Sequence, residues 1–385
     1  GQIALSAPKG KQSATVKARL KSLTASGATA GAATVDASGT DLLGDDPGLA
    51  AAFAATQIKV AGESIDHLSA KAAGTLSTLN VSVDASGPSG SVSTAATVRA
   101  KSGETAITLA KLDLAINQVQ ARLLNPAEIT LRGGEARVAN LAIGARDGTL
   151  RLDAALTEQG NTAELRLEKL PLSVLDAAGS DLHFMGTVDA ALDLHGTKQA
   201  PDATLDLKGT GLGVQNASEQ LADLTLQGTW RAGVLQSNGR LALTKSSALD
   251  FTASLPVAAD PANGLPTIDS AAAIDARAQG KLDLGLANAF IPGGADHIAG
   301  LATIDLAAKG PLDQPSLSGS GKITDGAYEN QRYGTRLRDL TVDLSGEGSK
   351  LKIVSLSATT PGGGKLGGGG DVDFGGAQAV NVTVT

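Results

Sequence analysis

Residues 300–344 read GLATIDLAAKGPLDQPSLSGSGKITDGAYENQRYGTRLRDLTVDL. Apolar and polar side chains alternate over residues 304–308 and again over 340–344. Such alternation places every second side chain on one face of a β-strand. The dipeptides that favour turns here are Gly310-Pro311, Asp325-Gly326 and Tyr333-Gly334. The stretch therefore predicts four short strands joined by turns, and it holds no group of residues typical of a catalytic site.

An earlier part of the chain repeats this stretch. A shift of 114 positions places Gly300, Leu306, Gly310 and Pro315 on Gly186, Leu192, Gly196 and Pro201. An internal repeat of this kind indicates an architecture built from recurring units. We expect copies at approximately 170–283 and 284–385, within a single continuous body that spans residues 1–385.

The composition favours a thin, repetitive structure. The 385 residues include 48 Gly and no Cys, and aromatic residues make up 2% of the chain while hydrophobic residues make up 42%. Compact cores use large rings more often than this. Small aliphatic side chains suit a structure in which each unit packs only on its neighbours.

The charge pattern argues against nucleic acid as a partner. The net charge of −7 arises from 39 acidic and 32 basic residues mixed along the chain, without a basic stripe. The absence of Cys excludes disulfides and zinc–thiolate sites. No run of 18 apolar residues is present, so no membrane-spanning helix is expected. Because the chain begins at Gly1 rather than Met, we interpret it as a segment whose anchor or targeting signal could lie elsewhere.

Alternation continues from residue 58 to the end, and it predicts an all-β fold of mostly antiparallel sheet with roughly 25 strands. Three short segments are predicted to be helical: 49–57 (LAAAFAATQ), 172–178 and 286–290. A parallel β-helix would need a repeat of about 20 to 25 residues, which the sequence lacks. The fold expected is an elongated, curled sheet, U-shaped in section, with one or two short helices.

No catalytic, cofactor or metal site is predicted. The glycine-rich run at 362–367 lacks the Ser or Thr and the following helix of a phosphate-binding loop, so it indicates a turn. The four histidines are far apart, and none has metal-ligand spacing. His183 and His297 correspond in the repeat, but both are expected to be exposed. The chain is therefore predicted not to be an enzyme.

The apolar face itself is the candidate site. The number of predicted strands with one apolar face is larger than a closed β-sandwich contains. The sheet must therefore curl to shield its apolar face from water, and the curling leaves an apolar groove on the order of 100 Å long. Acyl chains suit such a lining because their binding depends on apolar area. The groove candidates are Leu112, Leu114, Ile116, Leu150, Leu152, Leu165, Leu167, Leu192, Leu194, Leu205, Leu207, Leu224, Leu226, Trp230, Phe251, Leu255, Leu282, Leu284, Ile304, Leu306, Leu340, Val342 and Leu344.

Several short sequence motifs resemble the repeats of the TamB family, within the AsmA-like superfamily. They are Gly310 to Pro315, Asp325-Gly326-Ala327-Tyr328, Tyr333-Gly334, Leu337-Arg338-Asp339-Leu340, Asn125 to Ile129, Val138 to Ile143 and Gly148-Thr149-Leu150. The resemblance covers most of residues 58–385, and its motifs are degenerate. Residues 1–57 match less clearly.

The resemblance implies a periplasmic, U-shaped sheet, anchored in the inner membrane by a region absent from this segment. It also implies a TamA-like, Omp85-type outer-membrane partner that contacts parts outside this segment. Members are associated with phospholipid passage between the membranes and with assembly of outer-membrane proteins. Two functions follow as expectations: a bridge-like conduit that shields phospholipid acyl chains, or a chaperone for unfolded outer-membrane β-barrel or autotransporter strands. An adhesin or a polysaccharide enzyme on a β-solenoid is disfavoured, because neither a short repeat nor an acidic cluster is present.

Overall fold

The computed structural model describes residues 1–385 except 8–9, 26, 61, 102, 117–118, 179–182, 198, 216–220, 244–246, 260–265, 286–287, 289–295 and 376–378. The chain is an all-β protein, as the alternation predicts. Twenty-five strands form antiparallel sheet and two more form a separate hairpin. Within the described residues, no helix is long and apolar enough to cross a membrane.

The chain divides into two compact units, Gly1–Ser180 and Asp181–Thr385. The predicted single continuous body and its two internal copies stay predictions. In the first unit the strands are β1 (Gln2–Ser6), β2 (Ser13–Ala25), β3 (Ala28–Thr40), β4 (Gly48–Val60), β5 (Glu63–Thr75), β6 (Thr78–Gly87), β7 (Gly90–Lys101), β8 (Glu104–Ile116), β9 (Val119–Leu123), β10 (Ala127–Arg132), β11 (Glu135–Ala145), β12 (Gly148–Leu156) and β13 (Asn161–Pro171).

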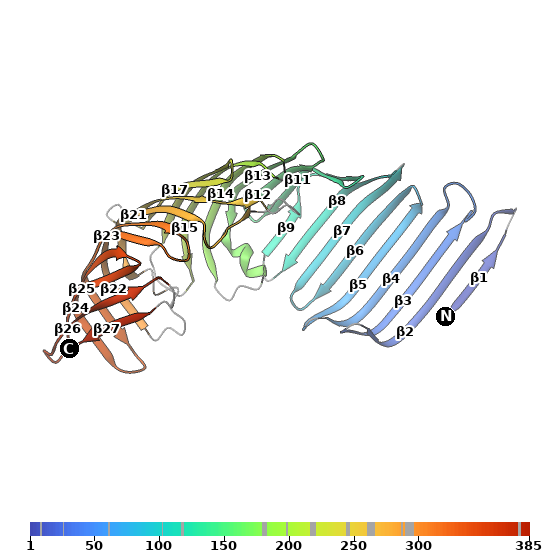
Figure 1. The fold of residues 1–385 in the computed structure, drawn as a ribbon. Helices are drawn as coiled ribbons and strands as arrows, with labels where there is room; N and C mark the ends of the chain where they lie inside the picture. The colour runs from blue at the N-terminus through green and yellow to red at the C-terminus, as the bar shows by residue number, and fades with distance from the viewer. Residues whose placement is uncertain are drawn as a thin grey trace. The chain divides into compact units, whose positions relative to one another are not determined.

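The first unit is a meander in which most strands pair with the next one along the chain (Figure 1). Strands β9 and β10 depart from this order, because each of them pairs with both β8 and β11. The two short strands together occupy the position of one long strand. Residues 124–126, which include Pro126, separate them. The short helix η2 (Leu172–Ala178) follows β13, as predicted, and is a 3-10 helix.

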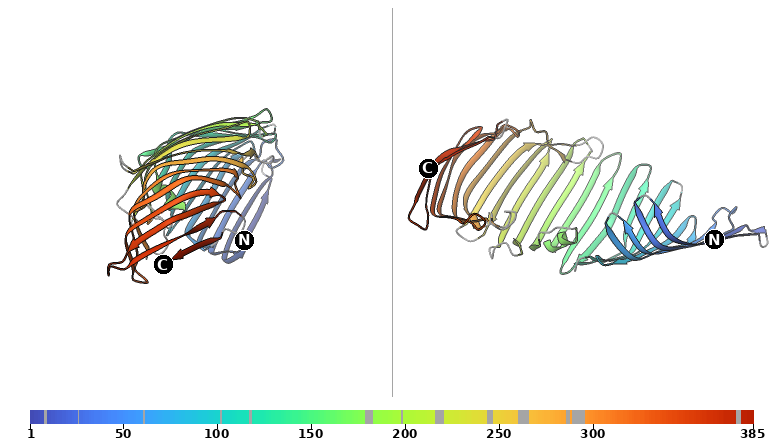
Figure 2. Two further views of the ribbon diagram at one scale, coloured as in Figure 1. Left: turned by 60° about the vertical axis from the view of Figure 1, so that its left-hand side comes forward. Right: turned by 90° about the horizontal axis from the view of Figure 1, so that it is seen from below.

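The second unit is also a meander. Its strands are β14 (Phe184–Gly196), β15 (Pro201–Val214), β16 (Ala222–Arg231), β17 (Val234–Ala242), β18 (Ala248–Pro256), β19 (Ala258–Ala259), β20 (Pro266–Thr267), β21 (Ala273–Asp283), β22 (Asp296–Pro311), β23 (Ser316–Asn330), β24 (Thr335–Gly348), β25 (Lys350–Thr359), β26 (Lys365–Asp373) and β27 (Val380–Val384). Strand β18 pairs with β21, and β19 and β20 form the separate hairpin between them. In Figure 2, the strands coloured orange to red bend along their length, so this unit is curled.

The predicted helix at 49–57 is wrong. These residues lie in β4, which pairs with β3 on one edge and β5 on the other. Alanine favours helices, but the paired edges satisfy the backbone groups and Leu49, Ala51, Phe53 and Ala55 alternate at strand spacing. The predicted helix at 286–290 falls outside the described residues except for Asn288.

The turn predicted at Asp325-Gly326 is also wrong. Residues 300–344 form three long strands rather than four short ones, and Asp325 and Gly326 lie inside β23. The pairing of β23 with β24 shifts register between Ile323 and Gly326, and Asp325 has a φ of 51°. A β-bulge needs such a residue, and Asp tolerates the left-handed region better than most side chains. The turn predicted at Tyr333-Gly334 is confirmed. Gly310 and Pro311 instead form the last two residues of β22, and the turn follows at residues 312–314.

The buried core of the described residues is small and made mostly of alanine. The accessible surface of the chain, 22554 Å² at 38.3 kDa, exceeds the roughly 17,000 Å² expected even for two separate compact bodies of half this mass. Both observations indicate sheets whose faces are largely open to solvent.

Candidate apolar face

One face of the first unit carries aligned apolar side chains. Because directly paired residues point to the same side of a sheet, the register defines rows that cross the strands. One such row is Ala18, Val35, Phe53, Ala70, Val83, Thr94 and Leu112. A second, shorter row is Leu123, Ile143, Leu150 and Leu167. We call this side the apolar face of the first unit.

The second unit has an apolar face of its own. One of its rows is Ala190, Leu207, Leu226, Gly239, Phe251, Ala278, Leu306 and Gly319. The next row is Val188, Gly209, Leu224, Leu241, Leu249, Gly280, Ile304, Gly321 and Leu344. Large aliphatic residues thus stand beside glycines on this face, and neighbouring side chains extend over some of these glycines, as Phe251 does over Gly239.

The structure brings nearly all predicted groove residues onto these two faces. Leu112, Leu114, Ile116, Leu150, Leu152, Leu165 and Leu167 lie on the apolar face of the first unit. Leu192, Leu194, Leu205, Leu207, Leu224, Leu226, Trp230, Phe251, Leu255, Leu282, Ile304, Leu306, Val342 and Leu344 lie on that of the second.

Two candidates deviate from the rows. Leu340 pairs with Gly326 beside the bulge of β23, and its own strand shifts register against β25 between Arg338 and Thr341. Leu284 follows the end of β21 and lies outside the strand. Simple alternation fails at these positions, because a bulge or a strand end breaks the period of two.

The side chains of these faces are less buried than those in the interior of a β-sandwich. Trp230 and Val342 are buried, but all other predicted groove residues keep a partly exposed side chain. Large aliphatic residues between two packed sheets are normally fully buried. The apolar faces are therefore not covered by a second layer in the described part of the chain.

Sequence reasoning missed several members of the rows. Phe53 was assigned to a helix, and Val35, Val83, Ile143, Leu241 and Leu249 were not chosen as groove residues although the structure aligns them with the others. The same alternation that identified Leu224 and Leu226 would have identified Leu241 and Leu249.

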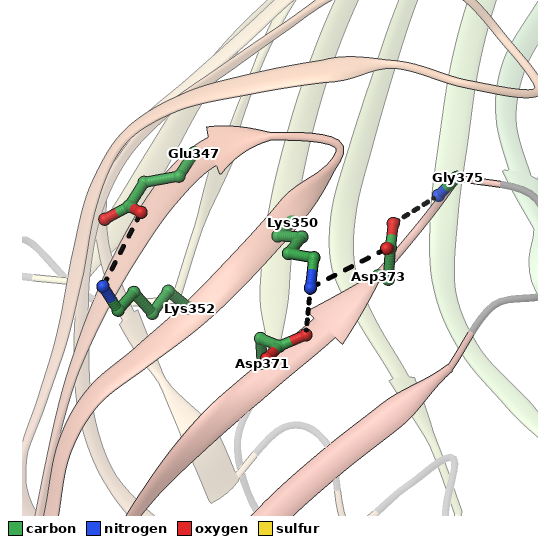
Figure 3. Close-up of polar contacts among 6 residues, drawn as sticks. All are labelled: Glu347, Lys350, Lys352, Asp371, Asp373 and Gly375. Carbon is green, nitrogen blue, oxygen red and sulfur yellow. Dashed lines mark hydrogen bonds and ion pairs between the residues drawn. The ribbon is translucent and has the colours of Figure 1, made fainter.

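The opposite face is polar and paired by charge. In the second unit, Lys350 Nζ lies 3.0 Å from Asp371 Oδ2 and 4.0 Å from Asp373 Oδ2, while Lys352 lies 3.7 Å from Glu347 (Figure 3). The Arg240–Asp250 and Arg277–Asp305 pairs follow the same pattern across other strands. Each exposed pair contributes little stability by itself, but together they keep this face wetted.

A few carboxylates at strand ends have altered pKa values. Hydrogen bonds from Tyr328 Oη and Asn330 Nδ2, both 2.6 Å long, lower the pKa of Asp296 below its usual value. The hydrogen-bonded Arg231 lowers the pKa of Asp202 in the same way. These shifts arise from hydrogen bonds at the ends of strands.

One end of the second unit's apolar face is covered locally. Trp230 Nε1 donates a 3.0 Å hydrogen bond to the Val257 carbonyl, and Val257 is 2% exposed. Leu194, Leu235 and Leu255 pack against this pair. The predicted position of Trp230 on the apolar side is confirmed, and the hydrogen bond to Val257 fixes the orientation of its ring beside the open part of the face.

The described residues contain no cluster of three or more His, Asp or Glu side chains that could hold a metal ion. His183 and His297 are exposed, as expected.

Comparison of the chain with protein-family models, with curated proteins and with solved structures gave no match.

Proposed function

We propose that the protein is a periplasmic segment of a bridge-like protein that shields phospholipid acyl chains on its apolar faces during transport between the inner and outer membranes. The observation that carries the proposal is the row pattern of each unit, in which large aliphatic side chains align across many strands and stay partly exposed. Acyl chains gain free energy in proportion to the apolar area that they remove from water, without directional bonds. The resemblance to the TamB family supports the same function.

The paired charges on the opposite faces favour this reading over a protein that buries both faces of its sheet. An apolar ligand would shield the apolar face from water and leave the polar face exposed to solvent. We propose the periplasmic location, the inner-membrane anchor and the TamA-like partner on the basis of the resemblance alone.

A second candidate function is the handling of unfolded outer-membrane protein strands. The aligned apolar rows could also receive the alternate apolar side chains of an extended polypeptide, which adds to a sheet by main-chain hydrogen bonds. Photo-crosslinking from Leu226 and from Leu306 separates the candidates, because polypeptide adducts favour strand handling and lipid adducts favour transport.

The direct test uses Trp230, the single tryptophan of the chain. Phospholipids brominated on the acyl chain should quench its fluorescence, whereas phospholipids without bromine should not. Mass spectrometry of the purified protein should in addition detect bound phospholipid. Absence of both quenching and bound lipid would reject the proposal.

A further inference from the structure

The first unit contains a depression of about 680 Å³ that is lined mostly by residues of the polar face, together with Leu114 and Leu124. Its base follows one cross-strand row: Ser93, Asp113, Arg122, Gly144 and Thr149. Gly144 contributes no side chain to the middle of this row, and the side chain of Leu124 lies beside it. Ala115 is the small residue of the neighbouring row. The depression therefore lies where two small residues interrupt a face of longer side chains, and Leu124 forms part of its wall.

Two guanidinium groups line this depression without a carboxylate partner. The guanidinium groups of Arg122 and Arg146 form no ion pair or hydrogen bond within the described part of the chain. Some other cations of the unit are neutralised, as in the Arg132–Glu104 and Arg151–Glu168 pairs, whereas others, such as Arg99, form no ion pair in the described part of the chain. Arg122 and Arg146 differ from Arg99 because both line one depression.

The two carboxylates of the lining are not equivalent. Asp113 is already engaged by Lys111 Nζ at 3.2 Å. Asp147 is free and lies next to Arg146 in the turn that joins β11 to β12. With Asp113 neutralised, the two arginines and Asp147 leave one excess positive charge at the depression.

We propose that this depression binds an oxyanion of the phosphate ester class, with Arg122 and Arg146 as its cationic contacts. Guanidinium groups recognise phosphate through paired N–H donors. Ser91 and Gln120 also line the depression and provide uncharged hydrogen-bonding groups. The site is independent of the proposed function, because it lies on the opposite face from the apolar rows.

The phosphate group has two sources, a small soluble ester or a lipid headgroup at a membrane surface, and the test distinguishes them. Isothermal titration calorimetry at low salt measures binding of inorganic phosphate and of glycerol 3-phosphate to the full chain. Cosedimentation measures binding to phosphatidylglycerol vesicles, with phosphatidylcholine vesicles as the reference. Binding in either experiment should weaken as salt is added.

Substitutions in the depression test whether Arg122 and Arg146 bind the phosphate group. The double variant Arg122→Gln/Arg146→Gln should weaken binding by about tenfold or more, because it removes two charge-assisted contacts. Asp147→Asn should tighten binding, because it removes the free carboxylate. Arg99→Gln is the matched control, since Arg99 is an exposed arginine of the same unit that lies outside the depression.

Gly144→Leu tests the shape without changing the charge. A Leu side chain here would extend into the depression, and its Cβ atom would first meet Leu124 Cδ2 at 2.9 Å, so Leu124 would have to move. Loss of binding in this variant, with an unchanged circular dichroism spectrum, supports the site. No binding of either phosphate source, or equal binding by the double variant and the wild type, overturns it. A loss of equal size in Arg99→Gln also overturns it, because the effect would then be general charge.

Discussion

At the scale of single residues, side-chain parity decides which face a residue serves. Asp305 and Leu306 are neighbours in β22, yet Asp305 pairs with Arg277 on the polar face while Leu306 lies in an apolar row. A shift of one residue would exchange these roles. Function can therefore be tested by neighbouring substitutions of similar size.

Leu306→Asp and Leu226→Asp should reduce acyl-chain binding by about tenfold or more, because each places an unpaired charge where lipid must pack. Quenching of Trp230 by brominated phospholipid measures the loss. Asp305→Asn is the control on the other parity and should bind lipid as the wild type does. Equal loss from Leu306→Asp and Asp305→Asn would contradict the assignment of the faces.

A second residue-scale prediction concerns Asp296. The hydrogen bond from Tyr328 is the largest cause of its lowered pKa, so Tyr328→Phe should raise that pKa toward the ordinary value. A group whose folded pKa is depressed stabilises the fold above its unfolded pKa, and this stabilisation is lost as the pH falls through the folded value. The variant should therefore be less stable than the wild type at pH 7, with the difference shrinking below about pH 4.

Carboxyl carbon-13 NMR titration gives the pKa of Asp296 directly, and urea unfolding at neutral and acidic pH gives the stability difference. A pKa that does not move in Tyr328→Phe would show that the contact with Asn330 alone controls the carboxylate.

At the scale of elements, alternation predicts strands well but fails where the backbone departs from the regular period. It predicted the short helix η2 and most strands of the second unit. It could not distinguish β4 from a helix, because an alanine-rich segment satisfies both patterns and the pairing with β3 and β5 decides between them. It also treated Asp325-Gly326 as a turn, since a bulge and a turn use the same residue types.

The candidate apolar faces were likewise predictable only where the strands are regular. The parity of Leu224, Leu226 and Trp230 was readable from the sequence, because each lies in a strand without a local irregularity. The position of Leu340 was not, because its neighbour Asp339 has a φ of 49° beside a register shift. The depression at Gly144 was missed as well, since its lining comes from several strands and no spacing in the sequence brings those residues together.

The glycines of the second unit's apolar face give an element-scale prediction. Gly319 has a φ of 105°, and a Cβ atom there would collide with the backbone carbonyl of Asp305 in the neighbouring strand. Gly228 lies on the same face with ordinary backbone, and a Cβ atom there would first meet Leu205 at 3.7 Å. Gly319→Ala should therefore cost about 1–3 kcal/mol of unfolding free energy, whereas Gly228→Ala should be neutral or slightly stabilising.

Chemical unfolding followed by circular dichroism measures both values. A tolerated Gly319→Ala would mean that β23 does not need this backbone conformation for its bend. Because both variants add one methyl group to the same face, their difference isolates the backbone effect from any change in apolar area.

At the scale of the whole molecule, the chain leaves more surface in water than its mass requires, and much of that surface is aliphatic. A folded chain that buries so little relies on hydrogen-bonded strand pairing and on partial shielding within each row. A ligand that covers the apolar faces binds the folded chain and not the unfolded one, so it should raise the thermal unfolding temperature.

This coupling gives a prediction that separates apolar binding from headgroup recognition. A series of lysophospholipids of increasing acyl length, each below its critical micelle concentration, should bind with affinity that rises by about twofold to fourfold per methylene, since a fully shielded methylene is worth about 0.8 kcal/mol. Exchange of the headgroup at constant chain length should change affinity far less. Thermal unfolding midpoints and Trp230 fluorescence report the two trends independently. Affinity that follows the headgroup and ignores chain length would place recognition on the charged faces, and the aligned leucines would then be a structural feature of the sheet rather than its binding surface.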